Sequence, residues 1–247
     1  MFEDRRIYRQ QQRKKGLVSF EVTVQETNLH IQADAGLQAD IDLSGQAVQA
    51  VQQCRRLIED HIRKYPAFAR SLVPMQVPDT AAPIIRDMAQ AADAARVGPM
   101  AAVAGAVAEY TGQHLLSFSP EVIVENGGDI FICSNTDTVL TIFAGTSPLS
   151  MTTGIQVPRQ ENAFGVCTSS GTFGHSTSFG KADAVMVMAR SCMLADAAAT
   201  ALANQVNTAD DISAILEKGR QIPGIQGLVI IVGAQIGLWG SLKLVRV

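Results

Sequence analysis

The stretch AVMVMARSCMLADAAATAL, residues 184–202, joins two different hydrophobic patterns. Residues 184–189 form a short continuous apolar run, which is typical of a buried strand when it is flanked by other structure. From about Ser191 to Val206 the apolar residues recur at helical spacing, and most of the others are alanine. The stretch therefore predicts a strand that leads into a helix made largely of small residues.

Strands and helices also alternate in blocks along the rest of the chain. Residues 17–24 and 28–33 alternate apolar and polar side chains, which predicts a hairpin, and a long amphipathic helix is expected between Ser44 and Pro66. Further helices are predicted at 83–95, 99–116 and 209–219, and further strands at 121–125, 129–133, 139–144, 228–232 and 242–247. The three strands between 121 and 144 suggest an antiparallel meander. The order of elements predicts an α+β domain, with helices packed on antiparallel sheet.

Composition restricts the class of protein. The chain has 247 residues, of which 47% are apolar and 17% charged, so that it is long enough to bury a large core. The formal net charge of −3 gives no sign of a nucleic-acid-binding surface across the molecule. There is no signal peptide and no apolar run of the roughly 20 residues that span a bilayer, so we expect a cytoplasmic protein without a membrane partner. Its four cysteines form no CxxC pair and its histidines are scattered, which predicts free thiols and no zinc site.

The basic residues are concentrated at the N-terminus. Residues 1–15 contain six arginines and lysines against Glu3 and Asp4. Such an arm could contact RNA or a membrane surface, although a solvated edge is the more common outcome. We therefore divide the chain into a basic arm, residues 1–15, and one domain, residues 16–247.

Asp196 and Thr200 are the first candidate site. They are four residues apart on the predicted helix, so their side chains lie one turn apart on the same face, and Asn204 continues the stripe. A carboxylate and a hydroxyl placed in this way could offer two oxygens to a hard cation such as Mg²⁺. The alternative is that the three residues form the wet side of an amphipathic helix whose apolar side faces the core.

The second candidate is the turn in VIVENGGDIF, residues 122–131. Gly127 and Gly128 leave the backbone bare, which suits a tight turn and also a ligand lying across it. Asn126 and Asp129 could hold such a ligand, or they could satisfy the amides of the turn itself.

The third candidate is CTSSGTFGHS, residues 167–176, with its continuation to Lys181. Its hydroxyls and exposed amides could bind phosphate oxygens, and Lys181 could add a positive charge. His175 could act as an acid or base, or orient a hydroxyl. The glycine spacing is not that of a nucleotide P-loop, and an ordinary polar turn with a hydrogen-bonded histidine is the alternative.

Taken in order, these three stretches resemble the ApbE superfamily, the Mg²⁺-dependent flavin transferases. An apolar strand leading to GGD, a T-S-G segment, a histidine, and a strand that feeds an alanine-rich helix follow one another in the family's order. The resemblance extends over residues 97–235 and includes the helix GPMAAVAGAVAEY. Its most specific part comprises Ala189, Ser191, Ala195, Asp196, Ala197, Ala199, Thr200, Ala201 and Leu202. The resemblance implies a T-fold-like α+β architecture.

The resemblance also implies roles for the candidate residues. Asp196 and Thr200 would bind Mg²⁺, and His175 would lie at the reacting end. The binding site for the flavin nucleotide, FAD or FMN, would be lined by Asn126, Gly127, Gly128, Asp129, Thr168, Ser169, Ser170, Gly171 and Lys181.

The chain also departs from the family pattern. The family's lysine before the glycine of the alanine-rich helix is absent around Gly105, the D-P-x-T-G segment after the histidine has no room between Ser176 and Ala184, and the N-terminal M-G-T strand is missing. Two functions therefore remain open. One is a Mg²⁺-dependent enzyme that cleaves the FAD diphosphate or transfers FMN to the hydroxyl of an acceptor protein. The other is a binding protein, possible also as an oligomer, that holds a flavin, another nucleotide or a small metabolite without chemistry.

Overall fold

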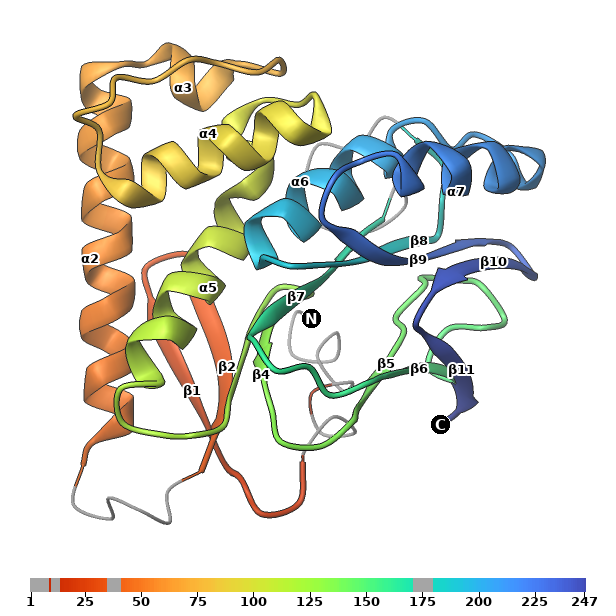
Figure 1. Cartoon of the computed structure of the whole chain (residues 1–247), viewed down its shortest axis with the longest axis horizontal. Helices are drawn as coiled ribbons and strands as arrows, with labels where there is room; N and C mark the ends of the chain where they lie inside the picture. Colours follow the sequence, from red (N-terminus) through yellow and green to blue (C-terminus); the bar gives the residue numbers. More distant parts are fainter. Residues whose placement is uncertain (1–8, 10–13, 35–40, 171–179) are drawn as a thin grey trace.

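The main sheet has eight strands in the order β1-β2-β3-β4-β7-β8-β9-β10 (Figure 1). The computed structural model describes Arg9 and residues 14–34, 41–170 and 180–247. Every neighbouring pair in the main sheet is antiparallel. Its strands are β1 (Val18–Val24), β2 (Thr27–Ala33), β3 (Val122–Asn126), β4 (Asp129–Cys133), β7 (Phe164–Ser169), β8 (Ala184–Ala189), β9 (Ile225–Val232) and β10 (Gln235–Gly240).

A smaller sheet contains the remaining strands in the order β11-β6-β5. They are β5 (Thr138–Thr141), β6 (Thr153–Val157) and β11 (Lys243–Arg246). The expected antiparallel meander of three strands is therefore correct for β3 and β4. It is wrong for the strand predicted at 139–144, because β5 belongs to the smaller sheet. After β4 the chain leaves the main sheet, and the neighbour of β4 on its other side is β7.

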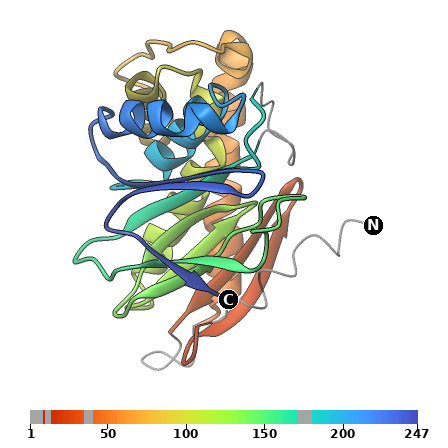
Figure 2. The same cartoon turned by 90° about the vertical axis from the view of Figure 1, so that its right-hand side faces the viewer.

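Helices pack against one face of the main sheet. Figures 1 and 2 show α6 and α7 over β8 and β9, with the long α2 running beside the first strands. The helices are α2 (Leu43–Lys64), α3 (Ala67–Arg70), α4 (Pro83–Ala95), α5 (Val103–Leu115), α6 (Cys192–Ala203) and α7 (Ile212–Arg220), with short 3-10 turns η2 (Pro99–Ala102) and η3 (Ala209–Asp211). Over the described residues, no helix is both long enough and apolar enough to cross a membrane.

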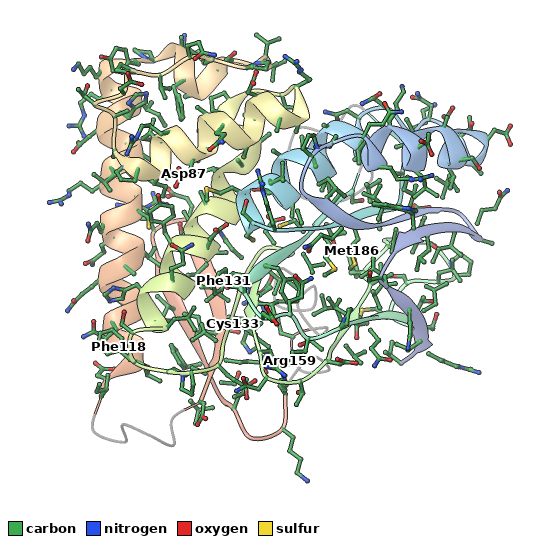
Figure 3. The ribbon with its side chains drawn as sticks, in the orientation of Figure 1. Asp87, Phe118, Phe131, Cys133, Arg159 and Met186 are labelled. Carbon is green, nitrogen blue, oxygen red and sulfur yellow. The ribbon has the colours of Figure 1, made fainter. Side chains whose placement is uncertain are left out.

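Two hydrophobic clusters occupy opposite sides of the main sheet. One lies between the sheet and the helices and includes Phe131 and Cys167. The other lies between the sheet and the smaller sheet, and includes Ile130 and Met186. Figure 3 labels one side chain from each cluster, Phe131 and Met186. The alternation of side chains along each strand explains this division, because successive residues point to opposite faces.

The expected α+β architecture is confirmed, with some differences at the ends of elements. The long helix starts one residue before Ser44, because the side chain of Asp42 accepts the N–H of Gly45 at 2.9 Å and caps the helix. The hairpin turn lies at Gln25 and Glu26, where Gln25 has φ 53°. The stretch expected to be helical from residue 99 begins with the 3-10 turn η2.

Candidate carboxylate site between two helices and the sheet

Asp196 lies where α6 touches the start of α5. The backbone N–H of Gly105 donates to Asp196 Oδ2 at 2.9 Å. A side chain at Gly105 would overlap the carbonyl of Cys192, so only glycine allows the two helices to come this close. The alanine- and glycine-rich sequence of α5 thus permits this close approach to α6.

Asp129, the first residue of β4, is the second carboxylate at this point. It pairs across the sheet with Cys167 of β7, whose thiol donates to the carbonyl of Cys192 at 3.3 Å. Burial raises the pKa of Asp129 well above its usual range, and the negative charge of Asp196 raises it further. Burial likewise raises the pKa of Asp196 to about 7, against the opposing effect of the Gly105 and Ala104 amides.

These pKa shifts describe an electrostatic conflict between two carboxylates. Ionisation of both carboxylates at neutral pH has a high free-energy cost, because the two negative charges lie close together where water solvates them poorly. The conflict is relieved when the pair holds a proton, or when a cation lies between the carboxylates. Asp129 is buried, whereas Asp196 and Thr200 are half-buried, so the face of α6 that carries them is not immersed in bulk water.

The three candidate donors are of the type that Mg²⁺ prefers. The carboxylates of Asp129 and Asp196 and the hydroxyl of Thr200 are hard oxygen donors. Among the described residues there is no group of three or more histidine, cysteine, aspartate or glutamate side chains that could enclose a metal ion. Two carboxylates without a full protein cage are the usual arrangement for Mg²⁺, which keeps several waters and binds substrate phosphates.

The glycine turn is held by its neighbours. Gly127 and Gly128 have φ of 66° and 109°, values that favour glycine. Glu125 Oε1 accepts the N–H of Gly128 at 2.8 Å, and the Gly128 carbonyl accepts the N–H of Thr168 at 3.2 Å. Asn126 Nδ2 donates to the carbonyl of Ala104 at 3.0 Å and so ties the turn to the start of α5. In the structure this turn lies directly before Asp129.

The hydroxyl-rich stretch begins at the end of β7. Thr168 and Ser170 are half-buried and Ser169 is buried. Thr168 lies opposite Met186 and therefore faces the smaller sheet, whereas Ser169 lies opposite Val185 and faces the helices on the same side as Asp129. Gly171 and His175 lie outside the described residues. Lys181 is exposed, and its backbone N–H donates to the carbonyl of Val206 at 2.7 Å. The structure thus places Lys181 beyond the C-terminal end of α6, away from the first half of that helix, where Asp196 lies.

Sequence reasoning missed two features near Asp196. Glu109 of α5 is buried, and its Oε2 accepts the backbone N–H groups of Cys192 at 2.7 Å and Met193 at 3.4 Å. The thiols of Cys167 and Cys192 are 3.4 Å apart, and both are free. No sequence signal indicates the glutamate, whereas the two cysteines stand in stretches already singled out.

Comparison with known proteins identifies relatives over almost the whole chain. A family model described as AbpE bacteria matches residues 8–238. A UPF0280 protein of Methanococcus aeolicus is 37% identical over 231 residues, covering 92% of this chain and 91% of its own length. A UPF0280 protein of Methanocaldococcus jannaschii is 38% identical over 226 residues, covering 90% of both chains.

Solved structures show the same fold at much lower identity. The ApbE protein of Thermotoga maritima has a TM-score of 0.57 at 14% identity, over 90% of this chain and 96% of its own. The apo form of a Pseudomonas stutzeri flavinyl transferase, ApbE, has a TM-score of 0.54 at 12% identity, over 90% of this chain and 94% of its own. At such identities the similarity establishes the architecture only.

Proposed function

This chain belongs to the family described as AbpE bacteria, and on that premise we propose that it is a Mg²⁺-dependent enzyme acting on a flavin nucleotide. The proposed reaction is cleavage of the FAD diphosphate by water, which yields FMN and AMP, or attack of an acceptor protein's hydroxyl on the FMN phosphorus, which forms a phosphoester and releases AMP and a proton. The solved Pseudomonas stutzeri protein with this fold is named a flavinyl transferase.

The observation that carries the proposal is the proximity of Asp129 and Asp196: Asn126, the cross-strand neighbour of Asp129, donates to the carbonyl of Ala104, and the next residue, Gly105, donates its N–H to Asp196. The two side chains come from distant parts of the sequence and are brought together on the helix-covered side of the main sheet. Two neighbouring buried carboxylates destabilise the folded protein at neutral pH, so a purely structural role does not explain them. A divalent cation that binds a diphosphate would compensate both negative charges.

Each part of the site then has a role. Asp129, Asp196 and Thr200 would hold Mg²⁺, which neutralises the diphosphate charge when it is bound. The helix α5 amides fix the orientation of the Asp196 carboxylate. Ser169 and Ser170 would line the diphosphate, with the bare backbone of Gly127 and Gly128 allowing a close approach, whereas the side chain of Thr168 points to the opposite face of the sheet. His175 would take the proton of the attacking water or of the acceptor hydroxyl.

A binding protein without chemistry is the second candidate. The polar atoms of Asn126 and Glu125 are hydrogen-bonded to the protein itself, and Lys181 lies at the far end of α6. Together with the missing D-P-x-T-G segment, this favours a site that retains the cation and loses the groups that bind the adenine half.

The test combines ligand binding with product detection. Purified protein is incubated with FAD, with and without Mg²⁺, while its melting temperature and the release of FMN and AMP are measured by fluorimetry and chromatography. The enzyme proposal predicts Mg²⁺-dependent product that Asp196→Asn reduces at least a hundredfold, whereas the exposed control Asp210→Asn leaves it unchanged. Stabilisation by FAD without product would favour the binding protein. Equal turnover by wild type and Asp196→Asn would exclude the proposed site.

A further inference from the structure

Arg9 is a buried arginine that comes from the basic N-terminal stretch. Its exposed fraction is 3%, and its Nε forms an ion pair with Glu125 Oε2 at 2.6 Å. Arg9 Nη1 also donates to Asn28 Oδ1 at 2.7 Å and to Glu21 Oε1 at 3.3 Å. The more common outcome expected for the basic arm, a solvent-exposed edge, does not apply to Arg9. Arg9 instead connects the first hairpin to β3.

Glu125 contacts both Arg9 and the glycine turn. While its Oε2 pairs with Arg9, its Oε1 accepts the N–H of Gly128 at 2.8 Å. Gly128 is the residue directly before Asp129, and its carbonyl is bound by the N–H of Thr168. One carboxylate thus joins a buried guanidinium to the backbone that carries Asp129.

The ion pair and the candidate site lie on opposite faces of the main sheet. Glu125 lies opposite Ile130, which belongs to the cluster facing the smaller sheet. Asp129 lies opposite Cys167, which belongs to the cluster beneath the helices. Within the described part of the chain, Arg9 therefore reaches the site through Glu125 and the turn and not by direct contact with Asp129.

We propose that Arg9 is a positioning residue: by pairing with Glu125 it holds the Gly127–Gly128 turn, and thereby Asp129, in the geometry that binds a divalent cation. The inference rests on the proposed function for the identity of the ligand. Its physical basis is that a buried carboxylate stays in place only when its charge is compensated. With its guanidinium removed, Glu125 gains by moving toward water, which withdraws the acceptor from the N–H of Gly128.

The experiment uses the full chain and Mg²⁺ alone as the probe. Mg²⁺ affinity is measured by calorimetry for wild type, Arg9→Gln, Glu125→Gln and the double variant. Because groups that orient a metal ligand typically contribute about 10–100-fold to affinity, Arg9→Gln is expected to bind Mg²⁺ about tenfold more weakly. In the double variant the amide oxygen at position 125 still accepts from Gly128 and needs no compensating charge, so its affinity is expected to return close to that of wild type.

Lys14 provides a matched control from the same N-terminal stretch. Its Nζ pairs with Glu121 Oε2 at 3.4 Å, at the other end of β3 from the turn. Lys14→Gln therefore removes a basic anchor without touching Glu125, and it should leave Mg²⁺ affinity unchanged. Equal losses of Mg²⁺ affinity in Arg9→Gln and Lys14→Gln would overturn the proposal. A double variant that binds Mg²⁺ no more tightly than Arg9→Gln would also overturn it. Either result would be explained by a general loss of stability.

The amide signal of Gly128 in a ¹⁵N-labelled sample gives a second readout that needs no cation. Its proton resonance is expected to move in Arg9→Gln, to return toward the wild-type position in the double variant, and to stay fixed in Lys14→Gln. An unchanged Gly128 signal in Arg9→Gln would overturn the positioning role. If wild type itself does not bind Mg²⁺, the proposed function fails, and the Gly128 signal still decides whether Arg9 holds the turn.

Discussion

Asp196 illustrates how the surroundings of a single carboxylate control its charge. Two backbone amides at the start of α5 favour its ionised form, yet burial outweighs them and raises its pKa to about 7. The sequence spacing of Asp196 and Thr200 suggested a cation site or a wet helix face. Asp196, Thr200 and Asn204 are the half-buried positions of this face of α6, and Asp129 lies near Asp196, so the cation site remains a proposal to be tested.

The raised pKa predicts a specific pH dependence of stability. Because the pKa of Asp196 is higher in the folded protein than the ordinary 3.8, the folded state holds a proton that the unfolded chain has already lost. The stabilisation is fully present below pH 4 and is lost as the pH rises through about 7. Asp196→Asn removes this loss, so in EDTA we expect the variant to be more stable than wild type at pH 8 by roughly 1–3 kcal/mol.

Urea unfolding at pH 5 and pH 8 measures this difference. At pH 5 only part of this loss has developed, because the folded carboxylate is still largely protonated, so the advantage of Asp196→Asn over wild type should be smaller than at pH 8. The free energies of unfolding of the two proteins should therefore diverge as the pH rises. A difference that is the same at both pH values would contradict the assigned pKa direction.

At the scale of elements, the start of α6 depends on a side chain from another helix. Glu109 of α5 accepts two backbone N–H groups from the first turn of α6, in addition to the cap that Ser191 provides through the N–H of Leu194. The first amides of a helix need such partners when they are buried. Glu109 therefore fixes the position of α6, and with it Asp196, relative to α5.

Replacement of Glu109 tests this connection. Glu109→Ala leaves the amides of Cys192 and Met193 without this acceptor, and we expect it to lower the free energy of unfolding by about 1–3 kcal/mol. Glu109→Gln keeps an acceptor oxygen and is the matched control, with a smaller loss. Thermal or urea unfolding measures both, and equal effects of the two substitutions would show that the hydrogen bonds from α6 contribute little.

The elements differ in how well the sequence predicts them. The first hairpin, α4, α6 and β8 follow from periodicity, because each has one clear pattern and one buried side. Strands β6, β7 and β10 were missed. Glycines interrupt β6 and β10, and β7 ends in the polar stretch that was considered a loop. Their strand character comes from pairing with neighbours, which local sequence does not encode.

The candidate site was predictable only in its parts. The glycine turn and the Asp196 stripe were visible as separate motifs, and the family resemblance put them in order. The pairing of Asp129 with Asp196 depends on the approach of α6 to the end of β7, which is a tertiary contact. Arg9 and Glu109 lacked any signal, because a buried charge is recognisable only once its partner is in place.

At the scale of the whole molecule, the main sheet separates two cores with different tasks. The helix-side core supports Asp129 and Asp196, while the core against the smaller sheet includes the apolar side chain of Leu242, close to the C-terminus. Leu242 is 5% exposed in this second core, whereas Leu244, two residues later, is 46% exposed. The two leucines thus offer a direct comparison.

Leu242→Ala is expected to lower the free energy of unfolding by about 2–4 kcal/mol, because it leaves a cavity beside Gly227. Leu244→Ala should change it by less than about 0.5 kcal/mol. Mg²⁺ affinity at a temperature where both variants are folded should match wild type, since the carboxylates lie on the other side of the sheet. A loss of Mg²⁺ affinity in Leu242→Ala would show that the two cores are energetically linked.

The strand order also determines how the chain can assemble. Every neighbouring pair in the main sheet except β4 and β7 is consecutive in sequence, and the longest connection, residues 34–121 between β2 and β3, includes α2, α4 and α5. Closing that long segment carries the largest entropic penalty in the sheet, so we expect the junction of β2 and β3 to form late during folding. The contact of Arg9 with Asn28 and Glu125 spans this junction, and it can complete only after the helices have folded back.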